Sequence, residues 1–230
     1  DSLIHKNKYE SYREYVEALK TNKELYDEFI NYLTINVSEF YRNPEQWEVL
    51  KEHIFPLLLK KSPSLKIWSS ACSTGDEPYT LVMILNKFLP LSKIRIKATD
   101  IDMDAINKAK QGIYLERSIK DLPAEFLNKY FKKTGDSTYK IIDEVKNCVD
   151  FSQLNLLKYD YPQNMDLIVC RNVLIYFTEE AKANIYKAFN RSLVHGGILF
   201  LGSTEQIIGS VKYGFKPIQT FFYQKVKKIE

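Results

Sequence analysis

The stretch IWSSACSTGDEP, residues 67–78, decides the fold. An apolar strand runs into a short loop of small residues, and Pro78 then opens a helix. A second apolar run, residues 94–98, ends at Thr99 and Asp100, 25 positions after Gly75. Open α/β sheets hold a nucleoside with two such features. The loop offers backbone N–H groups, and the acid accepts hydrogen bonds from two ribose hydroxyls. The stretch therefore predicts a cofactor site.

Outward from this stretch, strands and helices alternate from residue 65 onward, which indicates an α/β fold with a parallel sheet. The tail at 211–226 is typical of an antiparallel strand pair that completes the sheet. We expect strands at 65–71, 94–99, 149–153, 167–170 and 198–202, and helices at 79–88, 103–110 and 179–193.

Two regions do not follow this alternation. Residues 8–33 have helical periodicity with a division at Asn22, and another helix is expected over 44–60. Residues 112–147 combine a helix near 124–131 with a polar hairpin tip at 132–137. This second region predicts a small antiparallel insertion in the sheet domain.

The bulk composition excludes several classes of function. A chain of 230 residues, 45% hydrophobic and 27% charged, can bury one core with a small appended domain. Its net charge of +4 is mild, so we expect no nucleic-acid partner. Because no apolar run approaches the roughly 20 residues of a membrane span and no signal peptide is visible, we expect no membrane insertion. Three separated cysteines and three isolated histidines indicate reduced thiols, a cytoplasmic protein and no metal site.

The loop at 73–77 has two readings. It contains one glycine, so it is not the dinucleotide fingerprint, and it could be an ordinary strand-to-helix turn. Its spacing to Asp100 favours nucleoside binding. Asp100 could instead cap the following helix, but Asp102 is equally placed for capping and leaves Asp100 freer to bind a ligand.

Two further segments also leave alternatives open. The block CRNVLIYF, residues 170–177, follows a buried strand and delivers Arg171 and Asn172 at the sheet edge where ligands bind. The alternative is a structural Arg171 that satisfies helix termini and a Tyr176 that is merely packed. Residues 36–44 could cap the helix that starts near Pro44, or could fold over the cofactor and offer Arg42 to an anion.

Taken together, these segments resemble the chemotaxis receptor methyltransferases of the CheR type. The resemblance covers nearly the whole chain in the right order, and the block at 170–177 is its most specific part. The matching pieces are INVSEFYR (35–42), SSACSTGDEPY (69–79), ATDID (98–102), GIY (112–114), VDF (149–151), NL (155–156), CRNVLIYF (170–177) and GGILFLGSTE (196–205).

The resemblance implies a fold and a reaction. The expected fold is a Rossmann-like, seven-stranded methyltransferase sheet whose last strand is antiparallel. The expected domains are a helical domain over 1–43, truncated at its start, and a methyltransferase domain over 44–230 with a β-subdomain insertion at about 113–152. The reaction is methyl transfer from S-adenosylmethionine, leaving S-adenosylhomocysteine, to glutamate side chains in the cytoplasmic helices of chemoreceptors. We expect a monomer.

The resemblance also implies roles for individual residues near the transferred methyl group. Asn36, Ser38 and Arg42 would close over the cofactor, and Tyr176 with Arg42 would face the methyl group as the catalytic pair. A glutamate side chain is ionised at neutral pH because its free pKa is about 4.3. It can therefore attack the methyl group without a catalytic base.

Other residues would hold the remaining parts of the cofactor. Glu77 would reach its polar end, Asp100 would bind its ribose, and Gly75 belongs to the loop at 73–77 that comes before the helix. Four more residues complete the expected site, two beside the adenine and two along the cleft: Asn155 and Leu156, then Arg171 and Asn172.

Three competing functions stay open at this point. A relative could methylate another protein or a small carboxylic acid, and a non-catalytic module could sense the cofactor. Arg42 and Tyr176 argue against the sensor, which would not need a methyl-facing pair. A nucleic-acid methyltransferase would need a base-reading loop with two prolines. The segment Arg171-Asn172-Val173-Leu174 occupies the comparable strand end and contains no proline.

Overall fold

The computed structural model describes residues 4, 6–33 and 38–229. Contacts divide the chain into two units, Asp1–Val37 and Ser38–Glu230. Residues 38–43 belong to the larger unit, where Phe40 N donates to Ser118 O over 3.0 Å. The boundary that the sequence predicts near residue 43 stays a prediction.

Among its described residues, the smaller unit includes the helices α2 (Tyr12–Thr21) and α3 (Lys23–Leu33). Ser11 caps α2 through its side chain, which accepts from Glu14 N. Asn22 ends α2, and its Oδ1 accepts from Leu25 N over 3.0 Å at the start of α3. The predicted division at Asn22 is confirmed, and its cause is that one side chain interrupts the first helix and caps the second.

Within the described residues, the larger unit contains a sheet of seven strands in the order β6-β2-β1-β7-β8-β10-β9. Neighbouring strands are parallel except for β10, which is antiparallel to β8 and to β9. The predicted fold class is therefore confirmed. The strands are β1 (Ile67–Ser69), β2 (Ile96–Asp100), β6 (Val149–Gln153), β7 (Met165–Cys170), β8 (Leu193–Leu201), β9 (Phe215–Gln219) and β10 (Phe222–Lys225).

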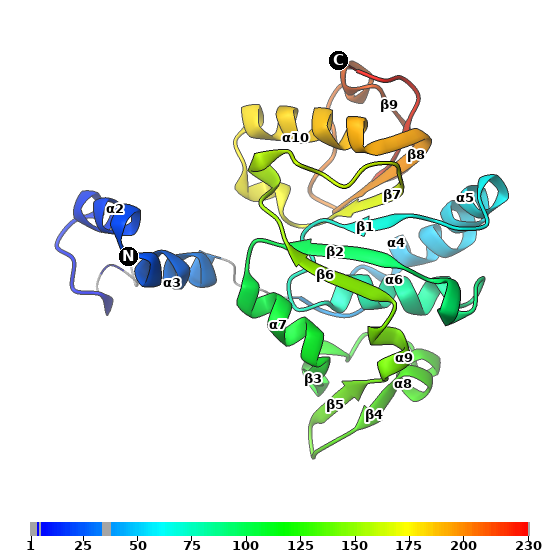
Figure 1. Cartoon of the computed structure of the whole chain (residues 1–230), viewed down its shortest axis with the longest axis horizontal. Helices are drawn as coiled ribbons and strands as arrows, with labels where there is room; N and C mark the ends of the chain where they lie inside the picture. Colours follow the sequence, from blue (N-terminus) through cyan, green and yellow to red (C-terminus); the bar gives the residue numbers. More distant parts are fainter. Residues whose placement is uncertain (1–3, 5, 34–37, 230) are drawn as a thin grey trace. The chain divides into compact units, whose positions relative to one another are not determined.

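The helices between these strands are α6 (Asp76–Leu85), α7 (Met103–Gln111) and α10 (Glu179–Ser192), visible in Figure 1. The sequence predicts that the last helix ends at residue 193 and that the last parallel strand begins at 198. In the structure α10 ends at Ser192, and β8 already begins at Leu193. Lys225 explains the difference, since its Nζ donates to Asn190 O and Leu193 O, both over 2.6 Å. These bonds satisfy carbonyl groups at the helix end, and Gly196 and Gly197 lie inside the strand.

The helix predicted over 44–60 is three segments, α4 (Pro44–Val49), a π-helical turn η1 (Leu50–Ile54) and α5 (Phe55–Lys61). Pro56 has no N–H to donate, and its ring would collide with the carbonyl four residues earlier in a regular α-helix. The wider turn avoids that collision, and Phe55 N donates to Leu50 O, five residues back.

The predicted insertion is a separate antiparallel sheet in the order β3-β5-β4. Its tip is a tight hairpin in which Thr134 N donates to Thr138 O over 2.9 Å. Because β6 belongs to the large sheet, this insertion closes before Val149, earlier than the expected end near residue 152. Its elements are β3 (Ile113–Leu115), α8 (Ala124–Tyr130), β4 (Phe131–Lys133), β5 (Thr138–Ile141) and α9 (Asp143–Lys146).

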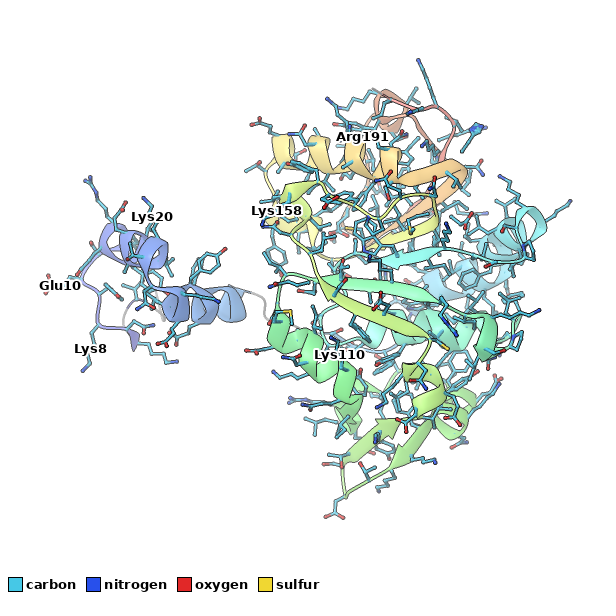
Figure 2. All side chains as sticks on the ribbon, viewed as in Figure 1. Lys8, Glu10, Lys20, Lys110, Lys158 and Arg191 are labelled. Carbon is cyan, nitrogen blue, oxygen red and sulfur yellow. The ribbon has the colours of Figure 1, made fainter. Side chains whose placement is uncertain are left out.

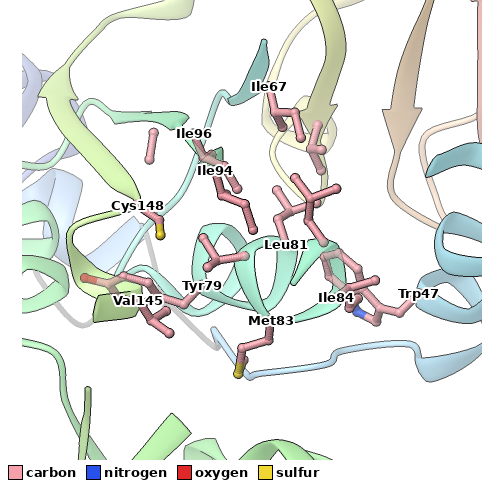
Figure 3. Close-up of a cluster of buried hydrophobic side chains, with 14 of the residues drawn as sticks. Trp47, Ile67, Tyr79, Leu81, Met83, Ile84, Ile94, Ile96, Val145 and Cys148 are labelled. Atoms are coloured by element: carbon pink, nitrogen blue, oxygen red, sulfur yellow. The ribbon is translucent and has the colours of Figure 1, made fainter. Parts of the chain in front are cut away.

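Both faces of the large sheet are buried, as the apolar runs along its strands require. Ile67 and Leu167 pack into one cluster with α6, which Figure 3 shows from close by. Their neighbours Trp68 and Ile168 point to the other face and pack into a second cluster with Phe189 of α10. The sheet is thus the middle of three layers, and its strand ends are positioned by packing on both sides.

Charged side chains such as Lys110, Lys158 and Arg191 are exposed on separate elements, as Figure 2 shows. Along the part of the chain that the structure describes, no helix combines the length and the apolar character that a membrane span needs. Cys72, Cys148 and Cys170 are buried free thiols, as their positions in the sequence predict.

Candidate functional site

The loop from β1 to α6 is held by hydrogen bonds to both neighbouring strands. Ser70 N donates to Val169 O and Cys72 N donates to Thr99 O, each over 2.9 Å. Gly75 ends the loop with φ +90, where a side chain is strained. A Cβ on Gly75 would also lie 2.9 Å from Ala109 Cβ. The loop is therefore a rigid part of the sheet edge, and only glycine fits at its end.

Asp100 lies at the end of β2 and fixes this loop. Its Oδ2 accepts from Ser73 N over 2.7 Å, and its Oδ1 accepts from Asp102 N over 3.0 Å. Burial raises the pKa of the Asp100 carboxyl, although these backbone donors oppose the rise. Asp102 caps α7 through bonds from Asp104 N and Ala105 N. Of the two acids that the sequence offers for capping, Asp102 takes the role, and half-buried Asp100 keeps part of its surface accessible.

Glu77 lies on the first turn of α6, 13% exposed at its side chain. Its Oε1 accepts from Ser69 Oγ over 2.8 Å, and its Oε2 lies 3.7 Å from Arg171 Nη1. Burial raises the pKa of Glu77 to about 7, while the charge of Arg171 and the Ser69 hydrogen bond oppose this rise. Glu77 is therefore a buried carboxylate that changes its charge near neutral pH.

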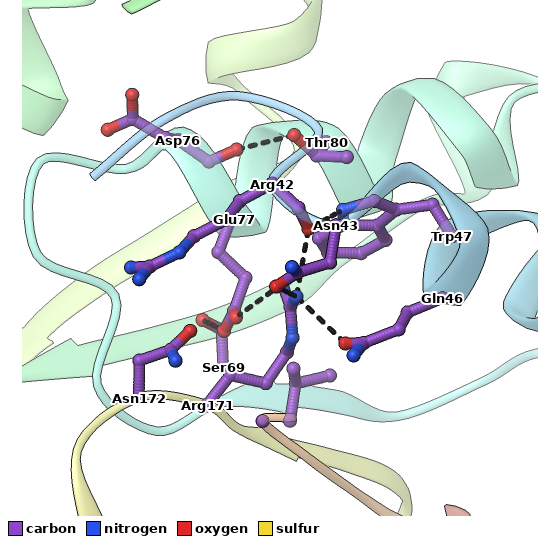
Figure 4. A network of polar contacts seen from close by, with 12 residues as sticks. Arg42, Asn43, Gln46, Trp47, Ser69, Asp76, Glu77, Thr80, Arg171 and Asn172 are labelled. Atoms are coloured by element: carbon purple, nitrogen blue, oxygen red, sulfur yellow. Dashed lines mark hydrogen bonds and ion pairs between the residues drawn. The ribbon is translucent and has the colours of Figure 1, made fainter. Parts of the chain in front are cut away.

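Arg171 follows β7 and ties the segment before α4 to the sheet (Figure 4). Its Nη2 donates to Arg42 O over 2.9 Å, to Asn43 Oδ1 over 3.1 Å and to Gln46 Oε1 over 2.9 Å. The guanidinium also stacks on aromatic rings, with Cζ 4.9 Å from the Trp47 centroid. Its side chain is 3% exposed. These contacts match the structural alternative, and a direct contact of Arg171 with a cofactor stays a prediction.

Other predicted residues come from two segments far apart in the sequence, one around residues 36–42 and the other around residue 176. Tyr176 ends a 3₁₀ turn, η5 (Leu174–Tyr176), and is 62% exposed, so it is not the packed tyrosine of the alternative reading. Arg42 is half-buried, and its side chain points away from the Trp47 ring in Figure 4. Ser38 forms a hydrogen bond that lowers the pKa of Asp76, although burial raises that pKa overall. Asn36 lies outside the described residues.

The residues predicted beside the adenine have structural roles of their own. Asn155 Oδ1 accepts from Leu157 N over 2.8 Å and caps the 3₁₀ turn η4 (Leu156–Lys158). The Leu156 side chain is buried in the core cluster of α10. Leu154 N donates to Asp100 O over 2.9 Å, which holds this segment beside the end of β2. Their contacts with a cofactor stay predictions.

Sequence reasoning missed two features of this edge. Glu205, three residues beyond Gly202, binds four backbone N–H groups around Asn172, and its signal was an acid directly after a parallel strand. Ile101 and Met103 follow Asp100 and expose apolar side chains. Exposed apolar residues directly after the acid of β2 are a signal for a flat ligand ring, since such a ring packs on apolar surface.

Among the described residues, no cluster of three or more His, Cys, Asp or Glu could hold a metal ion. The sheet order with its antiparallel β10, the loop after β1 and the acid at the end of β2 match the sheet and the nucleoside site that the sequence predicts. They fit S-adenosylmethionine and leave the substrate open.

Comparisons with known proteins identify the family. The profile described as "CheR methyltransferase, SAM binding domain" matches residues 36–223. The chain is 40% identical over 225 residues to a chemotaxis protein methyltransferase of Listeria monocytogenes, which covers 97% of this chain and 86% of that protein. It is 36% identical over 200 residues to the one of Escherichia coli, covering 83% and 68%. The chain belongs to the CheR methyltransferase family.

Solved structures with a similar fold include a TehB-like SAM-dependent methyltransferase from Corynebacterium glutamicum. The TM-score is 0.44 at 14% identity, and the match covers 79% of this chain and 93% of that one. The predicted family, the cofactor S-adenosylmethionine and a function as a methyltransferase of chemotaxis are confirmed by the family match and the relatives.

Proposed function

We propose that this chain methylates glutamate side chains in the cytoplasmic helices of chemoreceptors, with S-adenosylmethionine as the methyl donor. The observation that carries the proposal is that two strands, β2 and β7, end at the same edge of the sheet and carry different kinds of side chain there. The end of β2 carries Asp100 beside the rigid loop, and the turn after β7 carries Tyr176, 62% exposed. A cofactor bound at the end of β2 could therefore react with a substrate side chain that approaches Tyr176 from solvent.

The residues at the end of β2 fit S-adenosylmethionine. Asp100 would accept hydrogen bonds from the ribose, and Glu77 would meet the positively charged amino group at the polar end of the cofactor. Ser73 Oγ is buried without a hydrogen-bond partner among the described residues, so it can donate to a bound molecule. Asn155 and Leu156 would lie beside the adenine.

The residues at the end of β7 act on the glutamate of the substrate. When bound, the cofactor supplies an electrophilic methyl group. The substrate carboxylate is already ionised, so the chain needs to orient it rather than to remove a proton. We assign this orientation to the Tyr176 hydroxyl and the Arg42 guanidinium, with Ser38 closing the site and Asn172 lining the cleft. Alignment of this kind contributes several kcal/mol to rate enhancement in enzymes.

The charges constrain the role of Arg42. The carboxylate loses its negative charge as the neutral ester forms, so a cation that grips it tightly would stabilise the starting state more than the transition state. We therefore assign Arg42 the task of orienting one oxygen, and Arg171 the task of holding the segment of Arg42 to the sheet. The Arg171–Arg42 hydrogen bond of 2.9 Å supports this division.

Two measurements in sequence test the proposal. Calorimetric titration with S-adenosylhomocysteine should give binding at one site, which Asp100→Asn should weaken. Transfer of a radiolabelled methyl group from S-adenosylmethionine to receptor-rich membranes should then give label that mild base releases, because carboxyl methyl esters hydrolyse readily. Cofactor binding without base-labile label on the receptors would contradict the substrate.

We also propose that the chain acts in the cytoplasm and as a monomer. The first part follows from the proposed substrate, the cytoplasmic helices of receptors. Light scattering of the purified chain at micromolar concentration tests the second part, and a dimer would contradict it.

A further inference from the structure

Glu205 is a buried carboxylate whose two oxygens bind four backbone N–H groups. Its Oε1 accepts from Val173 N over 2.8 Å and from Leu174 N over 2.6 Å. Its Oε2 accepts from Asn172 N over 2.7 Å and from Gly202 N over 2.9 Å. Only 5% of the residue is exposed. The carboxylate thus joins the ends of β7 and β8.

Three of the four donors belong to the segment that leads to Tyr176. Asn172 has φ +59, a left-handed conformation that costs energy unless the surroundings hold it. Tyr176 N then donates to Val173 O over 3.1 Å, which closes the turn η5. Because the Tyr176 side chain is mostly exposed, the backbone of this turn rather than packing sets the direction in which the side chain leaves the main chain.

We infer that Glu205 is a positioning residue for methyl transfer, because it holds the turn that carries Tyr176. The inference rests on the proposed function, in which Tyr176 faces the methyl group. Glu205 itself is enclosed by backbone groups and touches neither substrate nor cofactor in this role. It acts through three successive N–H groups.

The requirement is for a carboxylate rather than for any acceptor. A glutamine has the same shape but only one acceptor oxygen, so its amide nitrogen would face two N–H donors in either orientation. Gly202 leaves the space that these hydrogen bonds need, because a Cβ there would collide with Glu205 Oε2 and lie 2.9 Å from Asn172 N. Glu205→Gln therefore disturbs the turn without creating a cavity.

A double-mutant cycle of Glu205→Gln and Tyr176→Phe tests the inference. We expect Glu205→Gln to lower kcat about tenfold in the wild-type background, no more than the loss of the Tyr176 hydroxyl itself, since small misplacements of catalytic groups can cost up to about 100-fold. In the Tyr176→Phe background the same change should lower kcat less than about threefold, because coupled residues are not additive. Equal losses in the two backgrounds would overturn the inference.

A matched control separates positioning from general destabilisation. Lys225→Met removes a buried charge that binds two backbone carbonyl groups, one in the last turn of α10 and one at the start of β8, the opposite end of that strand from Gly202. It should lower the melting temperature at least as much as Glu205→Gln and leave kcat unchanged. If Lys225→Met lowers kcat as much as Glu205→Gln does for the same fall in melting temperature, the effect of Glu205→Gln is ordinary destabilisation and the inference is wrong.

A second readout does not depend on activity. Amide hydrogen exchange of the full chain should become at least about tenfold faster at residues 172–176 in Glu205→Gln, with little change at residues 67–75. Unchanged exchange at 172–176 would overturn the inference even if activity falls. Faster exchange together with a wild-type chain that methylates no receptor would leave the backbone role of Glu205 in place and reject the proposed function instead.

Discussion

Two carboxylates at the ends of parallel strands, Asp100 after β2 and Glu205 after β8, do opposite things with the same chemistry. Asp100 accepts from Ser73 N and Asp102 N and stays half-buried, so part of it can meet a ligand. Glu205 accepts from four backbone N–H groups and is 5% exposed. The comparison teaches that a strand-end acid becomes a binding residue or a structural one according to how much of its hydrogen-bonding capacity the chain itself uses.

The largest effect on the free energy of unfolding is expected from Arg171, at the end of β7. Arg171→Met leaves Glu77 buried without its cation and leaves three acceptors on residues 42–46 without their donor. Breaking a buried pair in this way costs about 3–5 kcal/mol of unfolding free energy. Urea denaturation measures it. Lys20→Met, which removes an exposed partner of Glu17, is the control and should change stability by less than about 1 kcal/mol.

Asp100→Asn tests the binding side of the comparison. The substitution keeps the size of the side chain and removes the charge that strengthens hydrogen bonds to ribose hydroxyls. We expect the Kd for S-adenosylhomocysteine to rise about 30- to 100-fold, equivalent to about 2–3 kcal/mol. Calorimetric titration checks this. Glu205→Gln is the matched carboxylate-to-amide change, and its effect on Kd should be much smaller than its effect on kcat; the reverse order would invert the comparison.

Tyr176→Phe sharpens the comparison at the catalytic end. The hydroxyl is proposed to fix the geometry of methyl transfer, so its loss should lower kcat about tenfold while the Kd for S-adenosylhomocysteine changes less than about twofold. Initial rates of methyl transfer at saturating cofactor give the first quantity. Equal losses in turnover and affinity would refute the role. Tyr159→Phe, an exposed tyrosine beyond η4, serves as control.

A final effect concerns pH and Glu77, whose pKa is about 7 in the folded chain. Because the ionised form would bind the amino group of the cofactor, affinity should fall about tenfold for each pH unit below that pKa. Stability should move the opposite way. The folded pKa lies above the model-peptide value, so the ligand-free chain loses stability as pH rises towards 7. Titrations between pH 5.5 and 7 check the first trend, and Glu77→Gln should make the affinity independent of pH over this range.

Much of the fold could be predicted because its signals are local. Asn22 both interrupts and caps helices, and Asp102 caps α7 while Asp100 is left to the loop. Local signals failed where a distant residue intervened. Gly196 and Gly197 indicated the end of a helix, but Lys225, 32 positions from Leu193, satisfies the helix end earlier. Pro56 produced a π-helical turn rather than an end, because the helix could widen around it.

The sequence by itself determined the order of strands and helices through periodicity, and the family with its cofactor through a resemblance whose motifs are made of residues that are neighbours in the chain. Only the tertiary structure decided what the polar residues at the sheet edge do. Arg171 was left open between a cleft residue and a structural one, and its partner Arg42 O lies 129 positions away. Glu205 drew no prediction at all, because its task exists only where β7 and β8 end side by side. Hydrogen-bond partners are set by proximity in space, and a linear pattern does not contain that proximity.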